Sequence, residues 1–215
     1  MMFRMSSVVI LIGVCISAAL AGDKPGAAPD DVLAAARSYE DGGGYEWRDT
    51  GVPEEIRHQD VIILGRSDKG TYCCGFTFAV GMKVAQAAGL LNDKTPQQVK
   101  RMQREWYGSV KETAEKQMSD AMKNIGIGGP IDAKEARSGD FLQFWRTNGS
   151  GHSVIFLDWV VENGKPIGFT YRSSQKATNG IGDHTEYFDG HREGKVDLKR
   201  MYFARFNASE SVAQK

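Results

Sequence analysis

The 215-residue sequence has no excess of charge of either sign, since 27 basic residues balance 27 acidic ones. A nucleic-acid partner, or a membrane surface bound through basic residues, is therefore not expected. The sequence also lacks an internal repeat, and its one long apolar run extends only from Val8 to about Leu20. That run is shorter than the roughly 20 apolar residues that a transmembrane helix needs.

The apolar run predicts an export signal. Arg4 precedes it, and it ends in Ala19-Leu20-Ala21, the small-x-small pattern that signal peptidase accepts. Residues 1–21 are therefore expected to be a cleaved signal peptide, and the mature protein to be secreted or periplasmic with no stable membrane span. A retained membrane anchor is the alternative. The rest of the chain is long enough for one domain with a sizeable core.

Cysteine is scarce. Of three cysteines, Cys15 lies in the signal, which leaves the neighbours Cys73 and Cys74. Adjacent cysteines cannot form an ordinary structural staple, whereas small exported domains that depend on disulfides carry several well-separated cysteines. At least one of the pair therefore needs another explanation. A redox role through a vicinal disulfide is one alternative, but its strained ring would distort the local helix.

Apolar spacing and start signals predict the helices. A helix is expected over residues 74–88, a second after the cap Thr95-Pro96, and a third over residues 110–125 behind a capping box at Ser109. A short helix over residues 32–39 is expected to follow a flexible leader.

Later in the chain the apolar pattern changes to that of strands. Helices followed by an antiparallel sheet predict an α+β fold. The expected strands cover residues 61–64, 141–145, 153–161, 167–173 and 201–206.

A cysteine at a helix N-terminus has a physical reason to be reactive, because the helix dipole and free N–H groups favour the thiolate. Nucleophilic catalysis then needs a base, usually histidine. Of the four histidines, His152 is best placed, because it opens a strand directly after the loop 146–151. His58 lies in a charged stretch and is expected to be solvated. The alternatives are a buried structural cysteine and an ordinary core histidine.

The turn Asn163-Gly164 predicts how two strands pair. A type I′ hairpin turn at these residues places His152 opposite Gln175 and Val154 opposite Ser173. Gln175 is then the candidate to hold the imidazole, with Ser173 as its alternate neighbour. A bulge would shift the pairing by one residue.

Metal and cofactor binding are not expected. The separation of Asp183-His184 from Asp189-Gly190-His191 matches no recognised ligand spacing, and no cysteine joins them.

Three segments together resemble a known family. They are Cys73-Cys74-Gly75-Phe76, the Gly139-Asp140 strand that ends at Trp145, and the strand Gly151-His152-Ser153-Val154-Ile155. Cysteine peptidases and amidases of the NlpC and CHAP type, in the papain-like group, have a Cys-Ser-Gly-(Leu/Phe) box, a Gly-Asp strand and a His-Val/Ser-x-Ile strand in this order. The resemblance covers about residues 70–176.

The resemblance implies a papain-like fold, with the nucleophile at a helix start and N-terminal helices packed on a C-terminal antiparallel sheet. The hydrolase-type domain is expected over residues 46–207, after the leader and short helix of residues 22–45 and before a polar tail, 208–215. The implied triad is Cys73, His152 and Gln175, and an oxyanion hole would use the backbone N–H of Cys73. Cys74 fills the usual serine position and is the alternative nucleophile.

Further residues are expected near the cleft. They are Tyr72, which directly precedes Cys73, and Ser173 and Asn179 from the polar segment 172–182, which would line the cleft near His152. An ordinary polar loop is the alternative for that segment. The expected function is an exported thiol hydrolase that cleaves amide bonds, with a peptide or peptidoglycan substrate. The alternative is a non-catalytic module that binds cell-wall or peptide ligands on the same scaffold.

Overall fold

A computed structural model of the protein describes residues 26–47 and 50–208. The predicted signal peptide, and the predicted tail beyond residue 208, lie outside the described residues.

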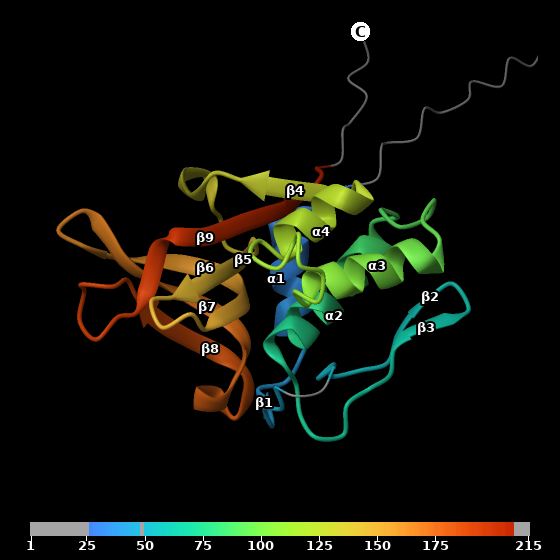
Figure 1. The fold of residues 1–215 in the computed structure, drawn as a ribbon, viewed down its shortest axis with the longest axis horizontal. Coiled ribbons are helices and arrows are strands. Elements are labelled where there is room, and N and C mark those ends of the chain that lie inside the picture. Colours follow the sequence, from blue (N-terminus) through green and yellow to red (C-terminus); the bar gives the residue numbers. More distant parts are fainter. Residues whose placement is uncertain (1–25, 48–49, 209–215) are drawn as a thin grey trace, which may run out of the picture.

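The predicted α+β class is confirmed: helices pack against a large antiparallel sheet (Figure 1). The seven-stranded sheet has the order β1-β8-β7-β6-β5-β9-β4, and neighbouring strands in it are antiparallel. Its strands are β1 (Gly42–Gly43), β4 (Gly128–Ile131), β5 (Phe141–Arg146), β6 (Gly151–Glu162), β7 (Lys165–Gln175), β8 (Gly180–Tyr187) and β9 (Val196–Phe206). A separate hairpin consists of β2 (Ile56–His58) and β3 (Val61–Leu64).

The helices lie together on one side of the sheet (Figure 1). They are α1 (Pro29–Arg37), α2 (Cys73–Ala87), α3 (Pro96–Trp106) and α4 (Met118–Ile125), with short 3₁₀ turns η1 (Ala133–Glu135) and η2 (Lys176–Thr178). Helix α2 packs on β6 and β7, and α4 packs on β4, β5 and β9. None of the helices in the described part of the chain is long and apolar enough to cross a membrane.

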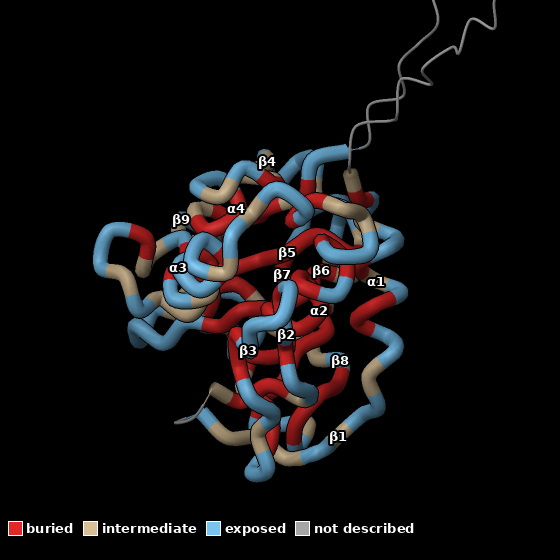
Figure 2. Tube along the Cα trace, turned by 90° about the vertical axis from the view of Figure 1, so that its right-hand side faces the viewer, coloured by how far each residue is buried: buried red, intermediate tan, exposed pale blue. Residues whose placement is uncertain are grey.

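Alternate residues of the central strands enter two separate cores. Ile155 of β6 joins the core beneath the helices, whereas its neighbours Val154 and Phe156 join an aromatic core on the other face of the sheet. This alternation is what a strand that is buried on both faces requires. Figure 2 shows α2 and the central strands as largely buried elements.

The start of α2 is positioned by an unusually close backbone contact. Tyr72 is the N-cap, and its N–H donates to the carbonyl oxygen of Gly51 at 2.8 Å. A Cβ atom at Gly75 would lie only 2.1 Å from that same oxygen. Glycine at position 75 therefore lets the loop at Gly51 press against the first turn of the helix that carries both cysteines.

The hairpin turn is as predicted, since Asn163 and Gly164 both have positive φ, 51° and 74°. Two irregularities interrupt the β6–β7 ladder, one between Phe156 and Asp158 and one between Val160 and Val161. They cancel: the pair Ile155–Arg172 has the register that the turn alone predicts. The start of β6 therefore faces the end of β7 despite the bulges.

The predicted helix over residues 110–125 is only half right. Residues 111–117 form turns, and α4 begins at Met118 directly after Gln117, whose φ is 43°. Two tertiary contacts oppose a continuous helix. Trp145 Nε1 donates to the carbonyl oxygen of Glu115 at 2.9 Å, and the Gln117 side chain turns toward Cys74 and Ser153.

Other expectations also need correction. The short N-terminal helix covers Pro29–Arg37 rather than residues 32–39, and Asp31 accepts from the Ala28 N–H at 2.9 Å. His58 is buried, not solvated, and its Nε2 lies 2.8 Å from the carbonyl oxygen of Lys94. Most of the polar segment 172–182 belongs to β7, η2 and β8, so the alternative of an ordinary loop is wrong.

Strand β8 was not predicted, because its sequence is polar. In the structure, charged residues of this strand form ion pairs. Its Asp183 pairs with Arg37 and with Arg172, whose side chain is almost fully buried. Arg172 also donates to the carbonyl oxygens of Ala36 and Tyr39 and pairs with Asp41. This arginine therefore ties the end of α1 and the start of β1 to the sheet.

Gly75→Ala is expected to destabilise the protein by roughly 1–3 kcal/mol, the usual cost of an extra methyl group where there is no room. Gly65→Ala is the matched control, because a Cβ there meets no atom within 4 Å. Denaturant unfolding of the two variants measures the difference. Equal stability of both variants would contradict the close contact at Gly51.

Candidate active site

Cys73, Cys74 and His152 line one narrow cleft of about 150 Å³. The cysteines come from the first turn of α2, and His152 comes from the start of β6. The other lining residues are Tyr72, Gln117, Gln143, Trp145, Gly151 and Ser153. The cleft therefore lies where the helix N-terminus meets the beginning of the strand.

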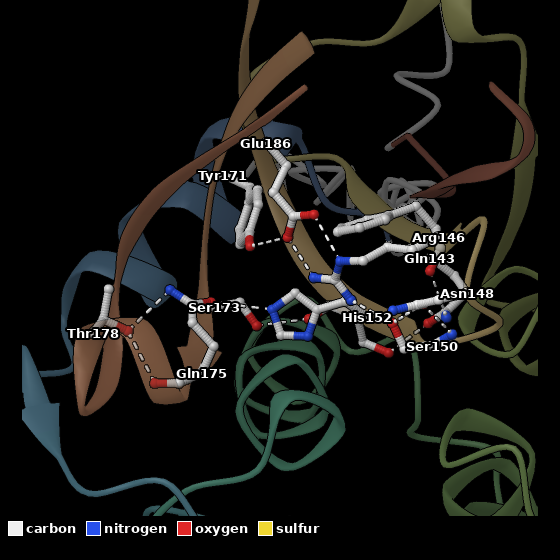
Figure 3. A network of polar contacts seen from close by, with 12 residues as sticks. Gln143, Arg146, Asn148, Ser150, His152, Tyr171, Ser173, Gln175, Thr178 and Glu186 are labelled. Atoms are coloured by element: carbon white, nitrogen blue, oxygen red, sulfur yellow. Dashed lines mark hydrogen bonds and ion pairs between the residues drawn. The ribbon is translucent and has the colours of Figure 1, made fainter. Parts of the chain in front are cut away.

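A directional chain of hydrogen bonds orients His152 (Figure 3). Thr178 Oγ1 donates to the carbonyl oxygen of Gly180 at 2.5 Å, so this hydroxyl accepts the 2.9 Å bond from Gln175 Nε2. The Oε1 atom of Gln175 is then the one that lies 3.0 Å from His152 Nε2. His152 must therefore carry a proton on Nε2, which leaves Nδ1 as the nitrogen available to Cys73.

The pKa of Cys73 lies well below that of an ordinary thiol. Burial by itself disfavours the thiolate, but several interactions outweigh it: a hydrogen bond from Cys74, the charge and hydrogen bonding of His152, and the backbone N–H of Ser153. The start of α2 contributes in the same direction. These interactions favour the thiolate form of Cys73.

Cys74 has the opposite character. Its Sγ lies 4.0 Å from Cys73 Sγ, 3.2 Å from Ser153 Oγ and 3.7 Å from Gln117 Oε1. The pKa of Cys74 is raised well above the ordinary value by its hydrogen bond to Cys73, by burial and by the negative charge on Cys73. The two neighbouring thiols are therefore inequivalent.

Tyrosines near the cleft respond to the same negative charge. The pKa of Tyr72 is raised, first by the charge on Cys73 and then by burial. Burial followed by the charge on Cys73 raises the pKa of Tyr45 as well. Both tyrosines therefore remain protonated beside the thiolate, and the Tyr72 hydroxyl is within hydrogen-bonding reach of Cys73.

An ion pair lies behind His152 on the side away from Gln175 (Figure 3). Arg146 Nε donates to Glu186 Oε2 at 2.7 Å, and the Tyr171 hydroxyl donates to Glu186 Oε1 at 2.8 Å. Burial raises the pKa of Glu186, but hydrogen bonding and charge from Arg146 outweigh it and hold the pKa below its usual value. The Tyr171 and Phe144 rings contact His152 and connect this pair to the imidazole.

The structure brings the predicted triad residues together, but it separates two of the residues expected near the cleft. Ser173 is fully buried, and its hydroxyl donates to the carbonyl oxygen of Ser153 at 2.7 Å. Asn179 ends η2 with φ 49°, and its carbonyl oxygen accepts from the Gly44 N–H. Neither lines the cleft, whereas Tyr72 does.

Five lining residues were not identified as site residues from the sequence: Gln117, Gln143, Trp145, Gly151 and Ser153. The sequence does contain a signal for Gln143, because it is a single amide inside the apolar strand Phe141–Arg146. The structure shows that this amide is almost fully buried. The sequence contains no such signal for Gln117, because its position depends on the interrupted helix before α4.

The described residues include no group of three or more His, Cys, Asp or Glu side chains placed to hold a metal ion. Comparison with known proteins found no matching family model, no similar curated protein and no similar solved structure.

His152→Ala is expected to raise the pKa of Cys73 toward the value of about 8.5 for a free thiol, because the charge and hydrogen bonding of His152 that favour the thiolate are lost. The pH dependence of iodoacetamide alkylation at Cys73 measures this shift. His184→Ala is the matched control. His184 contacts the Tyr171 ring from β8, but it is not among the residues that line the cleft. An unchanged alkylation midpoint in His152→Ala would contradict the proposed pairing.

Proposed function

We propose that this chain is an exported thiol hydrolase of the papain-like group, of the NlpC or CHAP type, that cleaves amide bonds in peptidoglycan peptides. The observation that carries the proposal is that Cys73, at the start of α2, shares one cleft with a His152 that Gln175 orients. The lowered pKa of Cys73 agrees with this arrangement. A buried structural cysteine would not need a charged partner, and a structural histidine would not need a cysteine in its cleft.

In the proposed reaction the Cys73 thiolate attacks the carbonyl carbon of the substrate amide. The backbone N–H of Cys73, at the first residue of α2, is the proposed donor to the oxyanion that forms. The protonated His152 then gives the proton on Nδ1 to the leaving amine, and the C–N bond breaks. The products of this half-reaction are a free amine and a thioester on Cys73.

Water completes the cycle. The neutral His152 accepts a proton from water as the water oxygen attacks the thioester, and the carboxylic acid leaves as the thiolate re-forms. Gln175 accepts a hydrogen bond from Nε2 throughout, so the ring keeps Nδ1 directed at the reacting atoms. Gln175 is therefore a positioning residue.

The proposed location and substrate class depend on the sequence rather than on the site. Export depends on the Arg4-led apolar run that ends at Ala21, and the substrate class depends on the resemblance over residues 70–176. The small cleft of about 150 Å³ agrees with an extended peptide whose amide bond enters between helix and strand.

Cys73→Ala and His152→Ala are each expected to lower kcat by roughly 10³-fold or more, because each removes a group that bonds to the reacting atoms. Release of peptides from purified peptidoglycan, followed by mass spectrometry, measures the activity. His191→Ala is the matched control, because His191 is exposed in the turn after β8. Unfolding curves of the variants establish that the fold survives.

Full turnover by Cys73→Ala would show that another residue carries the reaction. If the unmodified protein binds peptidoglycan peptides but does not cleave them, the hydrolase proposal is wrong and the non-catalytic binding module is favoured.

A further inference from the structure

The two neighbouring cysteines have opposite hydrogen-bonding surroundings. Donors approach Cys73: the His152 ring, the Ser153 backbone N–H and the Tyr72 hydroxyl. Oxygen acceptors approach Cys74, whose Sγ lies 3.2 Å from Ser153 Oγ and 3.7 Å from Gln117 Oε1. Cys73 and Cys74 are each only 3% exposed, so water cannot easily substitute for these partners.

The proton of Ser153 decides the direction of its contact with Cys74. Gln143 Nε2 donates to the carbonyl oxygen of Phe144 at 3.3 Å, so Gln143 Oε1 is the atom that faces Ser153. The 2.6 Å contact between Ser153 Oγ and Gln143 Oε1 then requires the hydroxyl proton of Ser153. With that proton committed, Ser153 Oγ can only accept from Cys74.

A thiolate at Cys74 would therefore be surrounded by lone pairs. Ser153 Oγ and Gln117 Oε1 both present acceptors, and a second negative charge at Cys73 lies 4.0 Å away. A buried anion whose side-chain neighbours present acceptors is costly, so the proton stays on Cys74. The pKa of Cys74 is raised first by its hydrogen bond to Cys73 and then by burial and the charge on Cys73, which together outweigh the opposing effect of Ser153 and of the Cys74 backbone.

We propose that Cys74 is a positioning residue: a thiol that stays protonated and donates its S–H to the Cys73 thiolate. Ser153 and Gln117 are alternate acceptors, which take this hydrogen bond when Cys73 carries an acyl group. The proton never leaves Cys74, so it takes part in no bond-making step. The catalytic consequence rests on the proposed function, but the effect on Cys73 does not.

The test measures the alkylation midpoint of Cys73 by iodoacetamide across pH in the full chain, with peptide mass spectrometry to identify the labelled cysteine. Cys74→Ser retains one donor, and Cys74→Ala removes it. Because a hydrogen bond to a charged group is strong, Cys74→Ala is expected to raise the midpoint by roughly one to two pH units. Cys74→Ser is expected to restore most of that shift.

A merely structural role of Cys74 would not separate Cys74→Ala from Cys74→Ser, because alanine and serine are close in volume. Labelling at Cys74 in the unmodified protein would overturn the proposal. An unchanged midpoint in Cys74→Ala, or an equal rise in Cys74→Ser, would overturn it as well.

Ser153→Ala provides a test that does not depend on the folding of Cys74→Ala. It removes an acceptor that competes for the Cys74 proton, so the Cys73 midpoint is expected to stay or to fall, and a rise would overturn the proposal. No substrate enters these experiments. A protein that cuts no amide bond can therefore still support this inference, and an active one can still contradict it.

Discussion

The docking of the first turn of α2 on the start of β6 is the constraint on which the candidate site depends. It brings Cys73 and Cys74 against His152 and Ser153, residue pairs that are far apart in the chain. The backbone oxygen at Gly51 holds the helix start from the other side, and only a glycine at position 75 leaves room for it. A side chain there would push the cysteines away from the strand, and the electrostatics of the cleft would change with the distance.

Two hydrogen-bonded chains meet at the cysteines, and both donate away from the cleft. In the first, His152 Nε2 donates to Gln175 and Gln175 Nε2 donates to Thr178, which leaves the other ring nitrogen for Cys73. In the second, Cys74 lies against the Ser153 hydroxyl, which donates to Gln143. Donors therefore approach Cys73 and acceptors approach Cys74, and in a buried site this difference decides which sulfur holds the negative charge. The Arg146–Glu186 pair behind His152 adds paired charge that does not compete for the imidazole nitrogen bonded to Gln175.

Prediction of the fold succeeded where local chemistry dominates. The cap at Thr95 and the glycine-containing turn at Asn163-Gly164 specify their structures through hydrogen bonds and φ angles a few residues apart. It failed where distant contacts override local preference. The expected helix over residues 110–125 is interrupted because Trp145 takes the Glu115 carbonyl and Gln117 turns into the cleft. Strand β8 was missed because Asp183 is paired with Arg172 and Arg37, which sequence polarity cannot show.

By itself, the sequence determined that a cysteine begins a helix, that His152 begins a strand, and that the turn register places Gln175 opposite that histidine. Each of these follows from short-range spacing, and the cancelling bulges in β6 and β7 left the register intact. Only the tertiary structure decided that Cys73, rather than Cys74, faces His152, and that Gln117, Gln143 and Ser153 complete the cleft. The physical reason is that a thiol's charge depends on whether donors or acceptors surround it, and those groups arrive from separate elements whose side chains only folding brings together.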